Sequence, residues 1–377
     1  MIDRIHIKNF KCLKDININF RKLTVLAGSN SVGKSSVIQA LLISRITVEK
    51  LIQYNMLDKD TEFQSNPQIP LNGKYLLNLG NTSEVLSRNA SSSVITISLF
   101  DKLDGGQMLL PFVAEDTRQD FYNLELRKDW RSYNFNNLKN EFYYLNAERL
   151  GPRLSYDVEQ QEFENVGCQG EYSIQVLAQN KENKIVNFET RGFQGITDSK
   201  LISQVRSWMN YIIPGFYIDI AELEGKLKKA YTTYSNSSPT NVGFGISYVL
   251  PIVVSGLIAK EDSMFIVENP EAHLHPKGQS NIGYFLGQLA NSGLQIIIET
   301  HSEHVVNGIR RATLEKKNNT DEVLLNFFSG IDSDKNSTVK EIFISKSGDL
   351  TNFPKDFFDQ VQQDMYSLFN MQKVNNG

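Results

Sequence analysis

Two stretches of this sequence hold residue types that could do chemistry together. Residues 28–35 have the sequence GSNSVGKS, and residues 265–276 have the sequence FIVENPEAHLHP. Glycines, hydroxyl side chains and a lysine suit the binding of an oxyanion such as phosphate. The second stretch combines two carboxylates with two histidines, which suits a metal ion, proton transfer or the acidic edge of a nucleotide site.

The glycine-rich stretch matches the pattern G-x-x-x-x-G-K-[ST] without a gap. An apolar run at residues 22–28 precedes it, and apolar side chains at helical spacing follow from residue 33, which predicts a strand, a turn and a helix. In that context the N–H groups of the turn and the helix N-terminus converge on an anion. The expected phosphate-binding residues are Gly28, Ser29, Asn30, Ser31, Val32, Gly33, Lys34, Ser35 and Ser36.

A site of this kind also needs magnesium ligands. The lysine of the motif reaches the β- and γ-phosphates, and the serine hydroxyl after it binds the ion. A carboxylate from a neighbouring strand holds the ion through water. The apolar run MFIVE ends in Glu268, and ligands of open α/β sheets bind at the carboxyl ends of strands. The sequence therefore predicts ATP and Mg²⁺ as cofactors, with Ser35 and Glu268 as the metal-binding residues.

Four residues are candidates for the hydrolytic chemistry: Glu268, Asn269, Glu271 and His301. Asn269 follows the expected metal carboxylate, and an amide can orient a water molecule but cannot take its proton. Glu271 is the alternative base, because the proline before it fixes the local turn. His301 follows a second apolar strand, where an imidazole could contact the γ-phosphate or the attacking water. Either Glu271 supplies the base or hydrolysis is slow, and the sequence leaves both possibilities open.

Zinc is the rival interpretation of the histidines. A zinc site needs three or four converging ligands, and His273 and His275 could combine with His301 and His304. That interpretation leaves the glycine-rich motif without a role. The simpler alternative for the first pair is local hydrogen bonding at the start of a helix, with Pro276 in the first turn.

Strand patterns dominate the first hundred residues. Residues 2–8 alternate in polarity, and residues 16–20 and 22–28 are apolar runs. Residues 92–100 have the pattern of a strand in an antiparallel layer. The stretch 117–140, rich in asparagine, arginine and aromatic residues, is expected to be helical or looped.

The last third of the chain is the most regular part. The continuous apolar runs SMFIVEN and LQIIIETHS each precede a helical pattern, which indicates a parallel sheet covered on both faces. We therefore expect an N-terminal lobe with the glycine-rich motif and antiparallel strands at 1–100. A mixed and helical insertion is expected at 101–235, and a C-terminal lobe at 236–377.

The composition is that of an ordinary globular protein. The chain has 377 residues, 40% hydrophobic and 22% charged, with a net charge of −4, so no strong overall field draws it to nucleic acid or membrane. Two cysteines make a disulfide framework implausible. No apolar run approaches the roughly 20 residues of a spanning helix. We expect a cytoplasmic protein that does not contact a membrane.

Several blocks of the sequence, taken in order, resemble one branch of ATPases. They are IHIKNFKCLKDININF, GSNSVGKSS, NVGFGISYVLPIV, VENPEAHLHPKGQ and ETHSEHVVNGI. Together they resemble the RecF/SMC/OLD branch of ABC-type ATPases, and within it the stand-alone bacterial AAA ATP-binding proteins, which have phage-defence ATPase subunits among their relatives. The resemblance implies an α/β P-loop NTPase of ABC type, with a mixed sheet flanked by helices, an N-terminal antiparallel β layer and a helical insertion.

The resemblance also implies how such a head works. Two heads form a homodimer, or a higher homo-oligomer, around Mg-ATP, and His301 would be the switch histidine. The turn VGFGIS stands where these heads have their signature, and it would face the γ-phosphate bound to the other subunit. The residues that would do so are Gly243, Gly245 and Ser247. The alternative is that these glycines only shape a turn.

The resulting functional expectation is an ATP-hydrolysing head that switches a separate, nuclease-like effector in antiviral defence. One alternative is a RecF-like repair ATPase that binds DNA. Another is a nucleotide-dependent scaffold without turnover. A third is an OLD-like nuclease that uses Asp332 and Asp334, although the residues after them are too few for a separate domain of typical size.

Overall fold

The structure of the protein is a computed structural model. It describes residues 1–56, 66–88, 90–101, 105–114, 122–220, 229–230, 232–234, 237–241, 243–315, 320–331, 337–354, 357 and 360–375. No helix within these ranges is both long enough and apolar enough to cross a membrane.

Two large β-sheets organise the chain, and the first is antiparallel throughout. Its strand order is β2-β1-β5-β6-β7-β4, with β8 paired to β6. Ile5 and Ile7 of the first strand are fully buried, as the alternation at residues 2–8 predicts. The strands are β1 (Arg4–Phe10), β2 (Leu13–Asn19), β4 (Gln68–Pro70), β5 (Val94–Asp101), β6 (Gly106–Val113), β7 (Asn123–Leu126) and β8 (Arg131–Tyr133).

This antiparallel sheet extends further along the chain than the sequence indicated. β7 and β8 fall within residues 117–140, so the expectation of helix or loop there is wrong for these two strands. Both strands are short and β8 is largely exposed, and so neither produces a long apolar run. The expected boundary at residue 101 separates β5 from β6, which are hydrogen-bonded neighbours in this sheet.

The second sheet has the strand order β17-β16-β3-β15-β14-β9. The strands from β16 to β9 are parallel, and β17 is an antiparallel edge strand. β3, β14 and β15 are almost entirely buried, which confirms the predicted parallel sheet with both faces covered. The strands are β3 (Leu23–Gly28), β9 (Phe142–Leu145), β14 (Met264–Glu268), β15 (Gln295–Glu299), β16 (Val323–Ile331) and β17 (Ser337–Phe343).

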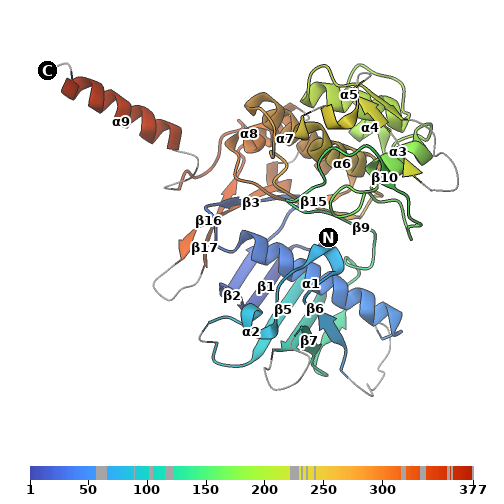
Figure 1. Ribbon diagram of the computed structural model, residues 1–377. Helices are drawn as coiled ribbons and strands as arrows, with labels where there is room; N and C mark the ends of the chain where they lie inside the picture. Colours follow the sequence, from blue (N-terminus) through green and yellow to red (C-terminus); the bar gives the residue numbers. More distant parts are fainter. Residues whose placement is uncertain are drawn as a thin grey trace.

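Helices cover both faces of the second sheet. α1 (Lys34–Gln53) lies between the two sheets, and one hydrophobic core joins it to both of them (Figure 1). A second core lies on the opposite face of the parallel sheet, beneath a group of helices. These helices are α5 (Leu201–Ile212), α6 (Phe244–Ile258), α7 (Pro276–Leu289) and α8 (Glu303–Glu315). α9 (Gln360–Asn375) extends away from the body of the molecule (Figure 1).

Shorter elements complete the fold. Side chains of α3 join the second core together with those of α5, so this part of the expected insertion is helical. The shorter elements are η1 (Lys74–Leu76), α2 (Thr82–Val85), β10 (Tyr156–Asp157), α3 (Ser173–Asn180), α4 (Phe188–Arg191), β11 (Ile218–Ile220), β12 (Lys229–Ala230), β13 (Thr232–Tyr234), η2 (Pro239–Asn241), η3 (Ala290–Ser292) and η4 (Thr320–Glu322).

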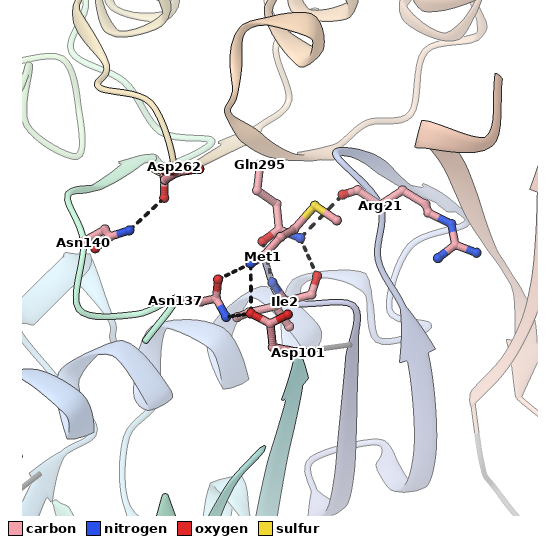
Figure 2. A network of polar contacts seen from close by, with 8 residues as sticks. All are labelled: Met1, Ile2, Arg21, Asp101, Asn137, Asn140, Asp262 and Gln295. Atoms are coloured by element: carbon pink, nitrogen blue, oxygen red, sulfur yellow. Dashed lines mark hydrogen bonds and ion pairs between the residues drawn. The ribbon is translucent and has the colours of Figure 1, made fainter. Parts of the chain in front are cut away.

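A polar network joins the beginning of β15 to the N-terminal sheet (Figure 2). The side chain of Gln295 accepts a hydrogen bond from the N–H of Ile2 at 3.0 Å and donates one to the carbonyl of Ile2 at 2.5 Å. Nearby, Asn137 donates to the carboxylate of Asp101 at the end of β5. The network therefore fixes the antiparallel sheet against the sheet whose other end carries the candidate site.

Candidate functional site

The turn between β3 and α1 has the conformation that the glycine-rich motif requires. Gly33 has a φ of 111°, and a Cβ at this position would lie 2.8 Å from Leu13 Cδ2 and 3.1 Å from Cys12 Sγ. No other residue fits there without displacing these neighbours. The turn leads directly into α1, whose first N–H groups and dipole favour an anion.

Lys34 lies folded over this turn. Its side chain is almost completely buried, and its ammonium donates hydrogen bonds to the carbonyl of Gly28 at 3.0 Å and to the carbonyl of Ser29 at 2.5 Å. Burial lowers the pKa of Lys34, and the nearby Glu299 carboxylate opposes this shift. The structure therefore holds the ammonium at the turn, where an entering phosphate would meet it.

A cavity of about 480 Å³ opens at this turn. It brings together residues that the sequence analysis predicted from three separate segments. Those that line it are Asn30, Ser31, Gly33, Lys34, Ser35, Ser36, Glu268, Asn269 and His301. Val32 instead packs its side chain into the hydrophobic core beside α1. Lys11, Cys12 and Gln39 also line the cavity and were not predicted.

Glu268 reaches the cavity from a strand that is not adjacent to β3. β15 lies between β3 and β14, which corrects the assumption that Glu268 ends the neighbouring strand. Its Oε1 accepts a hydrogen bond from the Tyr144 hydroxyl at 2.9 Å, and its Oε2 accepts one from the Ala147 N–H at 3.4 Å. Burial raises the pKa of Glu268, and the Tyr144 hydrogen bond opposes this shift.

The carboxylate nearest the predicted magnesium serine is Glu299, at the end of β15. The Ser35 hydroxyl donates to Glu299 Oε1 at 2.8 Å, and Oε2 is buried without a hydrogen-bond partner among the described residues. Burial and then the adjacent Glu268 carboxylate raise the pKa of Glu299 to about 7. The sequence analysis missed this residue. A signal was present, since the apolar run IIIE ends in an acid as MFIVE does.

Glu271 does not line the cavity. Its Oε1 accepts a hydrogen bond from the His301 N–H at 2.8 Å, and its Oε2 accepts one from the Thr300 hydroxyl at 2.7 Å. Both oxygens thus hold the turn that follows β15. Burial and then the Lys34 ammonium lower the pKa of His301, which favours a neutral imidazole at pH 7.

Asn269 has a left-handed φ of 44°, and its N–H donates to the carbonyl of Glu299 at 2.8 Å. The oxygen of its side-chain amide is buried and has no hydrogen-bond partner in the structure. An amide oxygen placed in this way can accept a hydrogen bond from a water molecule in the cavity.

A second functional candidate that the sequence analysis missed is Arg149, which forms hydrogen bonds with the backbone at the end of β14. It is only 3% exposed, and its guanidinium donates to three backbone carbonyls. These belong to Asn146 at 3.1 Å, Glu268 at 2.8 Å and Asn269 at 2.6 Å. Its Cζ also lies 5.3 Å from the centre of the Tyr248 ring on α6. Arg149 therefore links the acidic strand end to this helix.

The predicted signature turn packs against the loop that follows Glu268 in the same chain. A Cβ on Gly245 would lie 2.9 Å from the carbonyl oxygen of His273. Gly243 is exposed, whereas Ser247 is buried and its hydroxyl has no hydrogen-bond partner in the structure. The first turn of α6 thus presents Gly243 to solvent, but it does not present the serine hydroxyl.

The remaining histidines make local contacts. The His273 ring lies 4.6 Å from the Tyr248 ring, and His275 Nδ1 accepts a hydrogen bond from the Lys277 N–H at 3.4 Å, at the start of α7. Among the described residues, no three His, Cys, Asp or Glu side chains converge as a preformed metal site. Asp332 and Asp334 lie outside the described residues.

The donors at the cavity fit magnesium better than zinc. Mg²⁺ prefers oxygen ligands and keeps several waters, so it needs only one or two carboxylates from the protein. The Ser35 hydroxyl and the unpartnered oxygen of Glu299 are ligands of that kind. Zinc would require several nitrogen or sulfur ligands at one point.

Comparison with known proteins identifies the family. The chain matches the model of the family described as AAA ATPase domain over residues 1–145 and 136–306. Residues 319–368 match a family described as a protein of unknown function, DUF3696. None of the curated proteins matches the chain.

Among solved structures, similar chains include three SMC heads. One is an SMC head bound to the C-terminal winged-helix domain of ScpA, with 12% identity, 92% of this chain and 98% of that chain covered, and a TM-score of 0.49. Another is the SMC head domain from Thermotoga maritima, with 11% identity, 90% and 98% coverage, and a TM-score of 0.41. The third is an SMC head with an extended coiled coil bound to the C-terminal domain of ScpA derived from Pyrococcus furiosus, with 11% identity, 92% and 97% coverage, and a TM-score of 0.48.

The AAA ATPase match includes the turn before α1 and the ends of β14 and β15, and it spans more than half of the chain. The predicted architecture is confirmed, namely an α/β ATPase domain with a mixed sheet flanked by helices and an N-terminal antiparallel layer. The chain belongs to the AAA ATPase domain family.

Proposed function

We propose that the protein binds Mg-ATP in this cavity and hydrolyses it slowly. One observation carries the proposal: the N-terminus of α1, the Lys34 ammonium, the Ser35 hydroxyl and two strand-end carboxylates meet at a single cavity. The N–H groups and the ammonium suit phosphates, and the oxygen ligands suit Mg²⁺. The ion, when bound, would neutralise the phosphate charge that grows during the transfer.

The slow rate follows from the groups available to the attacking water. Asn269 has a free amide oxygen that can orient this water but cannot accept its proton. Glu271 does not line the cavity, and its oxygens accept hydrogen bonds from Thr300 and His301, so it would have to move to reach this water. A neutral His301 lines the same cavity and can contact the γ-phosphate. An ATPase built in this way would hold its nucleotide for a long time.

Nucleotide binding and phosphate release test this proposal. Lys34→Ala should abolish both, whereas Lys22→Ala, which removes an ammonium paired with Glu322 away from the cavity, should change neither. Glu271→Gln should slow phosphate release and leave ATP binding intact. Equal background release by the wild type and Lys34→Ala, with ATP still bound by the wild type, would favour a scaffold without turnover.

We further propose that two copies close around the nucleotide through the turn that begins α6. Gly243 supports this part, because it is exposed and a Cβ there would meet nothing within 4 Å. Gly245 and Ser247 would become available only if α6 shifts as the dimer closes. Gly243→Asp should leave ATP binding by the single subunit unchanged and prevent ATP-dependent dimers, because a carboxylate would face the γ-phosphate. Light scattering with and without ATP measures this, and dimers of unchanged mass would disprove it.

Closure of the dimer would signal to a separate nuclease-like effector in antiphage defence. α9 supports a protein partner, because it extends from the body and exposes the apolar side chains of Met365, Tyr366, Leu368 and Met371. An adjacent reading frame for a nuclease would support this role. An adjacent repair operon, together with salt-sensitive stimulation of the ATPase by DNA, would instead favour the RecF-like alternative.

A further inference from the structure

We propose that Glu299 is a magnesium-binding residue of this site and completes the metal position beside Ser35. The inference rests on the proposed Mg-ATP function and assigns a ligand that the motif does not contain. It concerns the carboxylate at the end of β15, the strand between the one that leads into the glycine-rich turn and the one that ends in Glu268.

The sheet register places the Glu299 carboxylate between β3 and β14. Glu299 is opposite Leu26 of β3 on one side and opposite Glu268 of β14 on the other. β3 continues into the turn and α1, and β15 pairs directly with β3. The Ser35 hydroxyl donates directly to Glu299 Oε1 at 2.8 Å. The hydroxyl that binds the metal in this motif is thus already paired with Glu299.

The second oxygen of Glu299 is available for a ligand. The residue is 5% exposed and lines the cavity, and within the described part of the chain its Oε2 is buried without a hydrogen-bond partner. A buried carboxylate oxygen without a partner is unfavourable unless a cation or a donor meets it. Lys34 directs its ammonium to the carbonyls of Gly28 and Ser29. A cation that enters beside Ser35 would give this oxygen its partner.

Glu268 is less free to take this position. Its two oxygens accept hydrogen bonds from Tyr144 and Ala147, on the side of the sheet that carries β9. Two buried carboxylates on adjacent strands repel each other, and a divalent cation relieves that repulsion. Glu268 therefore supplies the outer acidic edge of the site, and Glu299 holds the ion on the side of α1.

The test compares nucleotide affinity with and without metal for Glu299→Gln. A fluorescent ATP analogue is titrated in excess EDTA and then in excess Mg²⁺, and Mn²⁺ binding is followed by electron paramagnetic resonance with a non-hydrolysable ATP analogue. The variant should keep the affinity measured in EDTA. It should lose about 10- to 100-fold in Mn²⁺ affinity, as is typical when a group at a metal site is removed, and with it the increase in affinity that Mg²⁺ produces.

Two further variants make the outcome specific. Glu322→Gln is the matched control, because it removes a carboxylate that precedes β16 at the opposite end of the same sheet, and it should behave as the wild type. Lys34→Ala should weaken binding in EDTA as well as in Mg²⁺. Unchanged Mn²⁺ affinity in Glu299→Gln would overturn the inference and leave the proposed function standing. Equal losses in EDTA and Mg²⁺, together with a lower melting temperature, would show a purely structural role and also overturn it. Failure of the wild type to bind the nucleotide would overturn both.

Discussion

Replacing Arg149 by lysine should destabilise the protein strongly, although the charge is kept. The guanidinium donates to carbonyls of two chain segments, one at Asn146 and the other at Glu268 and Asn269. A single ammonium cannot span both segments with the geometry of the planar fork. Hydrogen bonds to charged groups contribute roughly 1.5–3 kcal/mol each, so the loss of two costs about 3–6 kcal/mol before relaxation. We expect a decrease of about 2–4 kcal/mol in the free energy of unfolding, since water and small shifts recover part of this loss.

Urea unfolding followed by circular dichroism measures this decrease. Arg153→Lys is the matched control, because Arg153 is exposed and lies four residues further along the same segment. Mg-ATP affinity is measured for both variants, and it should fall only for Arg149→Lys, because two of the freed carbonyls belong to residues that line the cavity. Unfolding of Arg149→Lys at the same urea concentration as the control would refute the reasoning.

Arg149→Met tests whether the hydrogen bonds outweigh the cost of burying the charge. Burial lowers the pKa of Arg149 to about 10, because the guanidinium loses its hydration at this position. A buried charge can be replaced by an apolar side chain without loss when its partners are removed too, but here the three carbonyls remain. Methionine should therefore be less stable than lysine. A methionine variant more stable than the lysine variant would show that the cost of burying the charge is larger than the free energy gained from its hydrogen bonds.

Three other predictions concern the frame around the site. Gly308→Ala in α8 should cost about 3 kcal/mol, because the new Cβ would lie 2.0 Å from a backbone oxygen of α7, whereas the exposed His304→Ala on the same helix should change urea unfolding little. Gln295→Ala should lower the melting temperature, at a cost of about 2 kcal/mol, because both backbone groups of Ile2 lose their partner. Burial raises the pKa of Cys168 to about 12, so iodoacetamide should alkylate it slowly at pH 8, and the rate should rise about tenfold for each unit by which the pH is raised towards that value. Rapid alkylation of Cys168 at pH 8 in the native protein, without any urea, would contradict the last prediction.

The glycine-rich turn was predictable because its pattern is local. The residues from Gly28 to Ser36 are contiguous, and their pattern specifies a turn of known conformation between a strand and a helix. The buried strands β14 and β15 were predictable for a similar reason, since a continuous apolar run marks a parallel strand covered on both faces. For these segments, the local sequence and the final fold agree.

The strand order was not predictable in this way, and it decides which acid is close to Ser35. Glu268 and Glu299 both end apolar runs, and the local sequence around either residue does not determine which of the two strands lies next to β3. That choice depends on how the crossover helices α7 and α8 pack on the sheet, which is a property of the whole domain. Arg149 was missed for a related reason, because its partners are backbone carbonyls, and these leave no trace in the sequence.

The position of Arg149 also bears on the proposed closure of two copies around a nucleotide. Its guanidinium holds the carbonyls of Glu268 and Asn269, and it lies against Tyr248 in the second turn of α6. The exposed Gly243 is the N-cap residue of this same helix. A displacement of the acidic strand end on metal binding would thus reach α6 through Arg149, and also through the packing of His273 against Gly245 and Tyr248. The proposed closure requires α6 to shift before Ser247 can face a partner, and Arg149 is one direct contact that would couple this shift to the occupancy of the cavity.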